Sequence, residues 1–335
     1  MKKWCKAVAF ASCLLFSQAA KAETAVLMTW GGVWQKTFEK VAADFQTKTG
    51  HQITVVAQAN ADAGLARLTA ARGKSDVDLW TPNMVNYSRA VKANLLAPLP
   101  GPDEITNLKD IPQSLRFKHS VTAWVSQRGI LYRRDLVPFV PHKWSDLWDP
   151  RLDRKMAAPS ATFDAGLFPL MAAVTEGGSE KSFDAGFNKL KQISGRFTAF
   201  YTSNVQSIRM LESGEVGLIA WGVLPNVIQY LGPDSKYGFV IPEPAFVAET
   251  PIAIVEGTKK AKLARDFINY VLSPEVQLTL SSAFGSTPAS MKSEIPKSLT
   301  DLIGPIPKHY VVDYDALSDA LPGVIDSYEK LVMTR

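Results

Sequence analysis

The stretch "AVLMTWGGVW" at residues 25–34 decides the fold class. Its first five residues are small or apolar, which is typical of a buried strand. Trp30 and the glycine pair 31–32 then stand where a strand passes into a helix, and residues 34–50 carry apolar side chains at helical spacing up to a terminating Gly50. The stretch therefore predicts a strand followed directly by a helix, with an aromatic side chain at the carboxyl end of the strand.

The same alternation continues along the next part of the chain. Residues 53–57 and 77–81 have the composition of strands, and residues 62–72 and 85–96 have the periodicity of helices. Alternating strands and helices indicate βαβ units around a mostly parallel sheet.

Two β-rich segments then divide the chain. They are "SVTAWVSQRGILYRR" at 120–134 and "KYGFVIPEPAFVAETPIAIVEG" at 236–257. Between them the pattern predicts a second α/β unit, with helices at 161–178 and 182–194 and a strand at 216–221. We interpret the two segments as crossings between lobes, which together form a two-segment hinge beside a cleft.

These crossings give the expected domain organisation of a two-lobed α/β clamshell. Lobe 1 comprises residues 23–125 plus 250–300, and lobe 2 comprises residues 126–249 plus 301–335. Each lobe is expected to hold a mostly parallel sheet flanked by helices. About 313 residues after residue 22 is also the size at which one core usually splits into two.

The N-terminal segment 1–22 has the features of a secretory signal peptide. Lys2, Lys3 and Lys6 precede an apolar run at 7–16, and Ala20-Lys21-Ala22 forms a small-x-small cleavage box. We expect cleavage after Ala22 and an exported, soluble protein. Whether Cys13 carries a lipid anchor is left open by the sequence.

Composition excludes several kinds of site. Both cysteines, Cys5 and Cys13, lie in the signal segment, so residues 23–335 contain no thiol for a disulfide, a zinc site or a nucleophile. Four lysines leave with that segment, so that 33 basic residues face 32 acidic ones and the net charge falls from +5 to about +1. This balance gives no reason to expect a nucleic-acid partner.

Catalytic and cofactor motifs are not found. His51, His119, His142 and His309 lack metal-ligand spacing, and the sequence has no nucleophile elbow and no phosphate-binding or dinucleotide-binding glycine motif. We expect no metal, no cofactor and no catalytic residue. A remote alternative is an exported hydrolase that uses Asp164 and Glu249 as an acid pair.

Four segments of the chain together resemble the substrate-binding proteins of ABC importers, within the group that includes the polyamine-binding proteins. They are "TWGGVWQKTFEKVAADFQTKTGHQITV" at 29–55, "WSDLWDPRLDRKMAAP" at 144–159, "LESGEVGLIAWG" at 211–222, and "AKLARDFINYVLSPEVQLTLSSAFGSTP" at 261–288. The resemblance implies the type II periplasmic-binding-protein clamshell. It also implies a monomer in the periplasm that captures a small-molecule solute in the cleft and delivers it to an inner-membrane permease.

The resemblance to polyamine binders suggests four residues of the pocket. In that group, aromatic walls hold methylene chains and cations, and carboxylates pair with ammonium groups. The matching positions are Trp124 and Trp221 for the aromatic residues, Asn83 for a polar residue after the third strand, and Asp164 for a carboxylate. Trp30 joins them because it ends the first strand, where open α/β sheets place their ligands. Each has a structural alternative, because the tryptophans can pack in a core, Asn83 can cap a helix, and Asp164 can be a first-turn acid.

Two departures from the polyamine pattern leave the solute open. The second expected carboxylate falls at Ala161, and a further acid falls at Thr250, with Glu249 beside it. Strand alternation points Glu249 away from the face of Thr250 unless a bulge intervenes. A polyamine-like cation or a zwitterion therefore remains one prediction for the solute.

An anion is the alternative prediction. "PSAT" at 159–162 and "YTSN" at 201–204 place hydroxyl groups before helices, where free backbone N–H groups attract anions. Thr202 and Ser203 are the candidates for holding a carboxylate or phosphonate, with Arg128 beside the first crossing; the hydroxyls can equally be helix caps.

Overall fold

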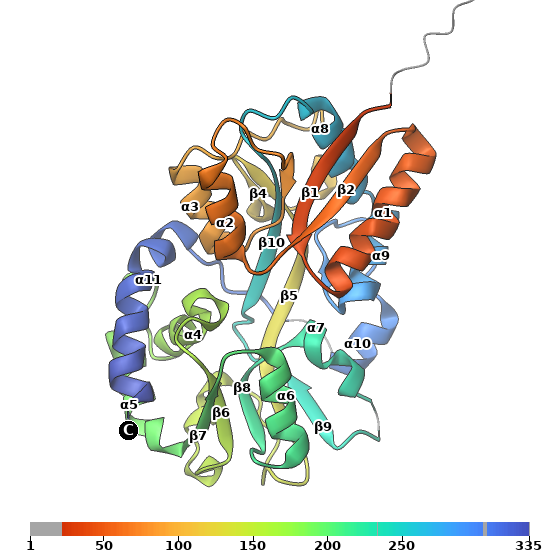
Figure 1. The fold of residues 1–335 in the computed structure, drawn as a ribbon. Helices are drawn as coiled ribbons and strands as arrows, with labels where there is room; N and C mark the ends of the chain where they lie inside the picture. Colours follow the sequence, from red (N-terminus) through yellow and green to blue (C-terminus); the bar gives the residue numbers. More distant parts are fainter. Residues whose placement is uncertain (1–21, 233, 304–306, 335) are drawn as a thin grey trace, which may run out of the picture.

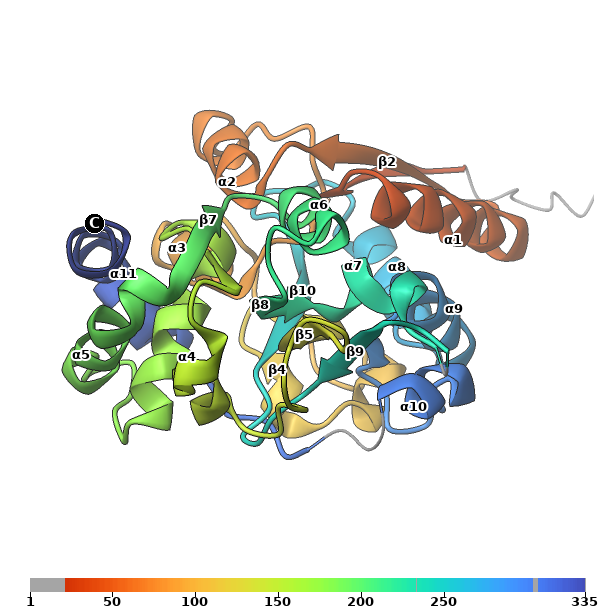
Figure 2. The same ribbon diagram turned by 90° about the horizontal axis from the view of Figure 1, so that it is seen from below.

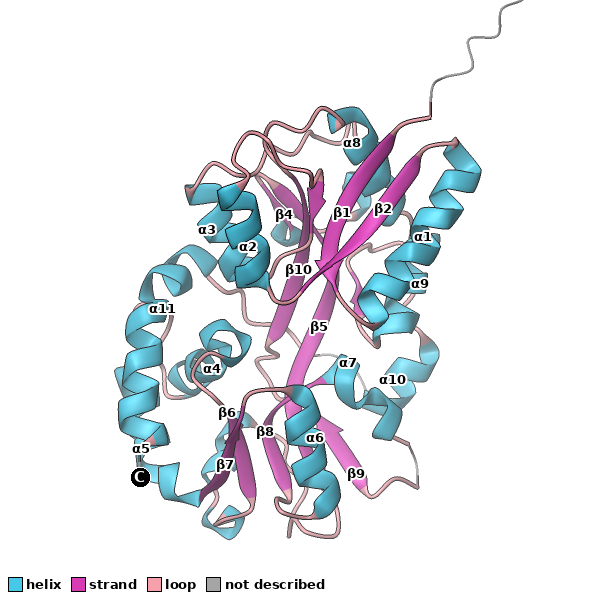
Figure 3. Ribbon diagram, viewed as in Figure 1, coloured by secondary structure: helices cyan, strands magenta, loops and turns pink. Residues whose placement is uncertain are grey.

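The computed structural model describes residues 22–232, 234–303 and 307–334. The expected signal peptide, with Cys13, thus lies almost wholly outside the described residues. Figures 1 and 3 show an α/β protein in which two groups of strands, each flanked by helices, are joined through long central strands. In chain order the helices and strands are β1 (Thr24–Trp30), α1 (Val33–Thr49), β2 (Gln52–Gln58), α2 (Ala61–Ala70), β3 (Leu79–Trp80), α3 (Met84–Lys92), β4 (Arg116–Phe117), β5 (Ser120–Arg133), β6 (Met156–Pro159), α4 (Leu167–Thr175), α5 (Asp184–Ile193), β7 (Phe197–Tyr201), α6 (Asn204–Ser213), β8 (Leu218–Val223), α7 (Leu224–Val227), β9 (Tyr237–Val240), β10 (Val247–Ile254), α8 (Ala261–Val271), α9 (Pro274–Phe284), β11 (Thr287–Pro288), α10 (Lys297–Ile303) and α11 (Tyr314–Tyr328).

The opening stretch folds as its sequence predicts. β1 ends at Trp30, and α1 begins three residues later at Val33. The turn between them needs Gly32, whose φ of 69° lies in a region that a residue with a Cβ rarely adopts. Trp30 is thus held at the carboxyl end of a parallel strand.

The strands form two mostly parallel groups around an antiparallel centre. The sheet order is β2-β1-β3-β10-β5-β8-β6-β7. β2, β1 and β3 run parallel to one another in one group, and so do β8, β6 and β7 in the other. We call the part built around β1 lobe 1 and the part built around β6 lobe 2; this two-lobed α/β arrangement confirms the predicted fold class.

The predicted crossings correspond to β5 and β10, which lie antiparallel at the centre of the sheet. The first half of β5 pairs with β10 and the second half pairs with β8 and β9, so one 14-residue strand belongs to both groups. The proposed lobe boundaries at 125/126 and 249/250 fall inside these two strands. The chain crosses once more after β11, because α10 and α11 pack on lobe 2.

Each lobe has a hydrophobic core on both faces of its strands. In lobe 1, α1, α8 and α9 cover one face, and α2 and α3 cover the other. In lobe 2, α4, α5 and α11 contribute to one cluster, and α6 and α7 contribute to the other. No helix among the described residues combines the length and the apolar character needed to span a membrane.

One predicted helix begins later than its sequence indicates. The helix expected at 161–178 is α4, which starts at Leu167, and three left-handed residues precede it. Asp164, Ala165 and Gly166 have φ values of 54°, 52° and 81°. Asp164 is therefore not a first-turn acid of this helix, because its backbone has left the helical region and its side chain points elsewhere.

Candidate functional site: the cavity between the lobes

A cavity of about 670 Å³ lies between the lobes. Its lining comes from both lobes and from the hinge strands, which is the arrangement that the predicted cleft requires. The polar and aromatic lining residues are Trp30, Trp34, Asn60, Asp62, Asn83, Asn86 and Arg89 from lobe 1, Thr162, Phe163, Asp164, Thr202, Asn204 and Asn226 from lobe 2, and Trp124, Ser126, Arg128, Glu249 and Thr250 from the hinge strands.

The carboxyl ends of parallel strands position most of these side chains. Trp30 is the last residue of β1, Asn60 follows β2, Asn83 follows β3 and Thr202 follows β7. Ligands of open α/β sheets bind at this edge, where the helices that follow the strands begin. The N-terminal ends of α2, α3 and α6 therefore border the cavity. At each end a capping side chain accepts one backbone N–H, and the N–H groups of the first helical turn that the cap does not reach remain for a solute.

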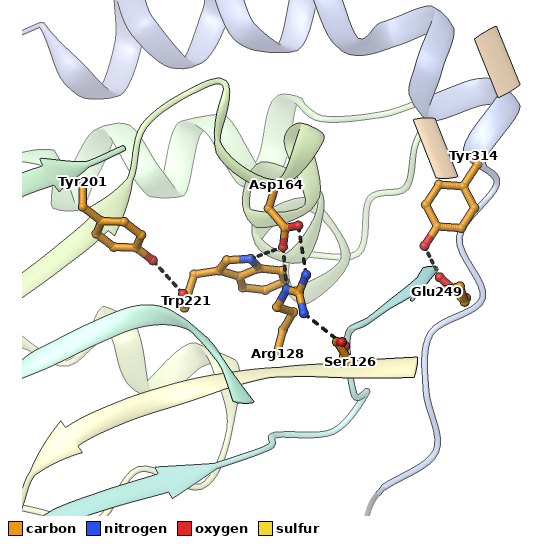
Figure 4. Close-up of polar contacts among 7 residues, drawn as sticks. All are labelled: Ser126, Arg128, Asp164, Tyr201, Trp221, Glu249 and Tyr314. Atoms are coloured by element: carbon orange, nitrogen blue, oxygen red, sulfur yellow. Dashed lines mark hydrogen bonds and ion pairs between the residues drawn. The ribbon is translucent and has the colours of Figure 1, made fainter. Parts of the chain in front are cut away.

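A buried ion pair forms one wall of the cavity. The Arg128 guanidinium donates two hydrogen bonds to Asp164, at 2.5 and 3.0 Å, and a third, at 3.1 Å, to the backbone oxygen of Ser126 (Figure 4). The Arg128 side chain is 7% exposed and the Asp164 side chain is 18% exposed. Burial alone raises the pKa of Asp164, but the charge and hydrogen bonds of Arg128 outweigh burial and hold that pKa below its usual value.

Trp221 contacts this ion pair from the core of lobe 2. Its indole N–H donates to Asp164 at 2.8 Å, and its backbone oxygen accepts a hydrogen bond of 2.6 Å from the Tyr201 hydroxyl (Figure 4). The Trp221 ring is fully buried and packs against Trp144 and Phe246. The left-handed turn at Asp164 places its carboxylate within reach of both the Arg128 guanidinium and the Trp221 indole N–H. We regard the backbone strain of this turn as a feature of the site.

Glu249 forms a second buried contact on β10. Its carboxylate accepts a hydrogen bond from the Tyr314 hydroxyl, at the start of α11 (Figure 4). Glu249 and Thr250 both line the cavity, and the register of β10 shifts between Thr250 and Pro251. Burial raises the pKa of Glu249 above its usual value, and the Tyr314 hydrogen bond offsets only part of that effect.

We expect Glu249→Gln to change how stability depends on pH. A raised pKa in the folded state means that the folded protein binds this proton more tightly than the unfolded chain does. The wild type should then lose stability relative to the variant as pH rises from the usual glutamate pKa to the raised one, by about 1.4 kcal/mol per unit of pKa difference. Urea unfolding of both proteins between pH 4 and 8 measures this; a difference that stays constant with pH would contradict it.

Two hinge hydroxyls face the cavity without a partner. Ser126 on β5 is 7% exposed and Thr250 on β10 is 9% exposed, and both line the cavity. Neither side chain has a hydrogen-bond partner within the described part of the chain. Because these hydroxyls border the cavity and have no protein partner there, they are suited to bind a solute or ordered water.

Six of the eight residues predicted for the pocket line one cavity. They are Trp30, Asn83, Trp124, Asp164, Thr202 and Glu249. The structure places Trp221 in the core behind Asp164, and Ser203 caps α6 by accepting a hydrogen bond from the Gln206 backbone N–H. The contacts of all eight with a solute remain predictions.

Sequence reasoning missed several lining residues. Asn60 follows a strand and caps α2, as Asn83 follows β3 and caps α3, so the same pattern pointed to it. Asn226 and Ser126 carried no comparable signal. Among the residues that the structure describes, no group of three or more His, Cys, Asp or Glu side chains is placed to hold a metal ion.

Comparisons with known proteins agree with this architecture. A family model described as "Bacterial extracellular solute-binding protein" matches residues 40–304. Of solved structures, an ABC transporter from Clostridium perfringens ATCC 13124 superposes with a TM-score of 0.81 at 20% identity, covering 92% of this chain and 99% of that one. The spermidine/putrescine ABC transporter substrate-binding protein PotD from Streptococcus pneumoniae has a TM-score of 0.77 at 17% identity, covering 93% and 99%.

A curated relative shares sequence over a shorter region. The phosphoglycerate transport regulatory protein PgtC of Salmonella typhimurium is 26% identical over 179 residues, which is 52% of this chain. The match spans 44% of the relative's own length, so it covers less than half of that protein.

Proposed function

Because the chain belongs to the bacterial extracellular solute-binding proteins, we propose that its interlobe cavity captures a small organic solute that carries a carboxylate or phosphonate group. The family and fold are those of ABC-transporter solute-binding proteins, which deliver small molecules to a membrane permease, rather than those of enzymes. In this proposal the chain acts as a monomer in the periplasm. Solute that contacts both lobes shifts the population toward the closed form.

We favour an anionic solute because every carboxylate in the cavity lining already has a hydrogen-bond or ion-pair partner. Within the described residues, Asp164 is paired with Arg128, Glu249 accepts from Tyr314, and Asp62 pairs with Arg89 at 2.8 Å. A solute ammonium group would therefore compete with Arg128 at Asp164 and with Arg89 at Asp62, and it would meet Glu249 already hydrogen-bonded to Tyr314.

Hydrogen-bond donors, by contrast, are available to a solute. The ends of α2, α3 and α6 present backbone N–H groups, and Ser126 and Thr250 add two unpartnered hydroxyls. These groups together favour a negatively charged group at this edge. The partial similarity to a phosphoglycerate transport regulatory protein supports a solute with an acid group.

The aromatic side chains of the cavity would also suit a zwitterion, which carries an acid group and a cation. Trp30 and Trp34 line the cavity beside Trp124 and are partly exposed. An indole face attracts a cation, so an amino acid derivative can place its acid group at the helix ends and its amine on this wall. A polyamine, the class of solute named for the spermidine/putrescine substrate-binding protein, would contact the aromatic side chains but would not use the helix ends that suit an acid group.

A thermal-shift screen of residues 23–335 tests the function. The protein is first unfolded and refolded to remove bound solute, then mixed with small carboxylates, phosphonates, amino acids, polyamines and sugars. We expect carboxylates or phosphonates to stabilise it, by about 2.7 kcal/mol at a hundred times the dissociation constant. Stabilisation by polyamines alone would overturn the proposal in favour of a cation site.

Trp30→Ala is the matched variant for this screen. Because Trp30 is only partly buried and lines the cavity, its removal should weaken binding of the identified solute more than tenfold and leave the free protein's melting temperature nearly unchanged. An equal loss of stability in the solute-free protein would instead make Trp30 a core residue.

A further inference from the structure

The last long helix, α11, contacts both lobes. Its C-terminal half is anchored in lobe 2, where Val324 and Tyr328 are buried and the Tyr328 hydroxyl donates to the backbone oxygen of Pro159 at 3.0 Å. Its N-terminal half lies beside α3 of lobe 1, as Figures 1 and 2 both show. α11 thus contacts both lobes in addition to the hinge strands β5 and β10 that join them.

Two polar contacts connect α3 to α11. The Ser88 hydroxyl donates to Asp315 at 2.5 Å, and the Lys92 ammonium group donates to Asp319, also at 2.5 Å. Ser88 is 2% exposed, so the first contact is shielded from water on the side of α3. Both contacts are direct and short, and neither can survive a movement that separates α3 from α11.

Apolar packing accompanies the polar contacts. Val85 of α3, in lobe 1, is 3% exposed and belongs to the hydrophobic cluster of lobe 2. Tyr314 at the start of α11 packs against that cluster and also against the lobe 1 cluster around α2 and α3. Its hydroxyl donates to Glu249 on hinge strand β10. We call these residues, Val85, Ser88, Lys92, Tyr314, Asp315 and Asp319, the α3–α11 seam.

The seam adjoins the cavity without its two polar pairs contacting it. The cavity is lined by Asn83, the N-cap of α3, by Val85, Asn86 and Arg89 of α3, and by Leu321 and Ile325 of α11. Ser88, Lys92, Asp315 and Asp319 are not among the lining residues. The separation of α3 from α11 therefore sets part of the width of the cavity.

A weak point in α11 separates its two halves. Pro322 lies inside the helix and has no N–H to complete the helical ladder, and Gly323 follows it. These residues lie between the α11 residues that contact α3, Asp315 and Asp319, and the buried Val324 and Tyr328. Leu317, which precedes the proline, is also fully buried in the lobe 2 cluster, so α11 is anchored in lobe 2 on both sides of Pro322.

We propose that the α3–α11 seam is an interlobe clasp that holds the lobes at the spacing of this structure, so that Ser88, Lys92, Asp315 and Asp319 control cleft opening without touching the solute. The consequence for solute affinity rests on the proposed function. The effect on lobe spacing does not, because it is measured without any solute.

Spin labels across the cleft mouth provide that measurement. Residues 23–335 contain no cysteine, so Val33→Cys and Val205→Cys introduce two unique labelling sites. Val33 is 44% exposed at the start of α1 in lobe 1, and Val205 is 61% exposed at the start of α6 in lobe 2. Their neighbours Trp34 and Asn204 line the cavity, so the two labels report the width of its mouth. Pulsed dipolar spectroscopy on the solute-free protein gives the distribution of distances.

Charge reversal of the exposed seam pair is the test. Lys92→Glu places two acidic groups opposite each other, and Asp319→Lys places two basic groups there, so each single variant should shift the distribution to longer distances. The exchanged pair Lys92→Glu/Asp319→Lys restores opposite charges and should return the distribution toward that of the parent protein. A distribution that stays unchanged in both single variants would overturn the clasp.

Lys48→Glu is the matched control. Lys48 pairs with Glu275 at 3.2 Å, with side-chain exposures of 50% and 76%, close to the 47% and 72% of Lys92 and Asp319. That pair joins α1 to α9 within lobe 1, so its reversal should leave the distances as they are. An equal shift in the control would show that any surface charge reversal opens the protein, which would also overturn the clasp.

Solute binding then separates this inference from the proposed function. With the solute identified by the screen, Lys92→Glu should weaken binding several-fold, and the exchanged pair should recover it. If no anion binds but the distances still shift, the clasp stands and the proposed solute class fails. If an anion binds with equal affinity to all variants and the distances are fixed, the proposed function stands and the clasp fails.

Discussion

Replacing Asp164 with alanine is expected to lower the free energy of unfolding by about 3–5 kcal/mol, because it leaves the charge of Arg128 buried without its partner. Arg128 is 5% exposed, and its remaining side-chain hydrogen bond is to the backbone oxygen of Ser126. Urea unfolding monitored by tryptophan fluorescence measures the loss. The variant also tests the predicted ligand role of the Asp164 carboxylate. If that carboxylate served only to bind a cationic solute, its removal would lower solute affinity and leave stability unchanged.

Two controls make the Asp164 result specific. Arg128→Met/Asp164→Leu removes both charges and should recover most of the lost stability, because a well-packed apolar pair often replaces a buried ion pair without cost. Asp301→Ala removes the partner of Lys297 on the surface, where both side chains are more than half exposed, and should change stability by less than about 1 kcal/mol. A loss for Asp164→Ala no larger than that of Asp301→Ala would show that Arg128 is not buried as described.

Trp221→Ala is expected to cost about 3–5 kcal/mol as well, but through a cavity in the core of lobe 2. The ring is fully buried and contacts Trp144, Phe168 and Phe246. Trp221→Phe keeps most of the packing and removes the hydrogen bond to Asp164, so it should cost clearly less than the alanine variant. If Trp221→Ala instead had the wild-type free energy of unfolding and lost only solute binding, Trp221 would be a ligand-binding residue, as the sequence suggested.

The fold was accessible from the sequence because its signals are local and repeated. The alternation of strands and helices, the glycine pair after Trp30 and the two β-rich crossings each correspond to an element of the structure. The start of α4 was not accessible. Asp164 and Ala165 adopt left-handed backbone conformations that only tertiary contacts can impose on non-glycine residues, and propensity favours helix there.

The position of the site could be predicted from the sequence, but the ion pair between its side chains could not. Trp30 and Asn83 stand at strand ends, so their place at the cavity follows from topology. The partnership of Arg128 with Asp164 joins residues 36 positions apart and depends on the left-handed turn, which no spacing rule reveals. Trp124 and Trp221 look alike in sequence. Both side chains are almost fully buried among aromatic rings, but Trp124 also borders the cavity, whereas Trp221 does not.

The central place of β10 determines when lobe 1 can be completed during synthesis. β10 lies between β3 and β5 in the sheet, yet residues 247–254 leave the ribosome after every strand of lobe 2. Until then β1, β2 and β3 form a three-stranded fragment whose β3 edge is unpaired, and such an edge is a template for aggregation. Lobe 2 can form its sheet from a nearly continuous run of chain, while lobe 1 waits for long-range pairing, which is slow. A chain truncated before residue 247 leaves the β3 edge unpaired and is therefore expected to aggregate more readily than the full chain.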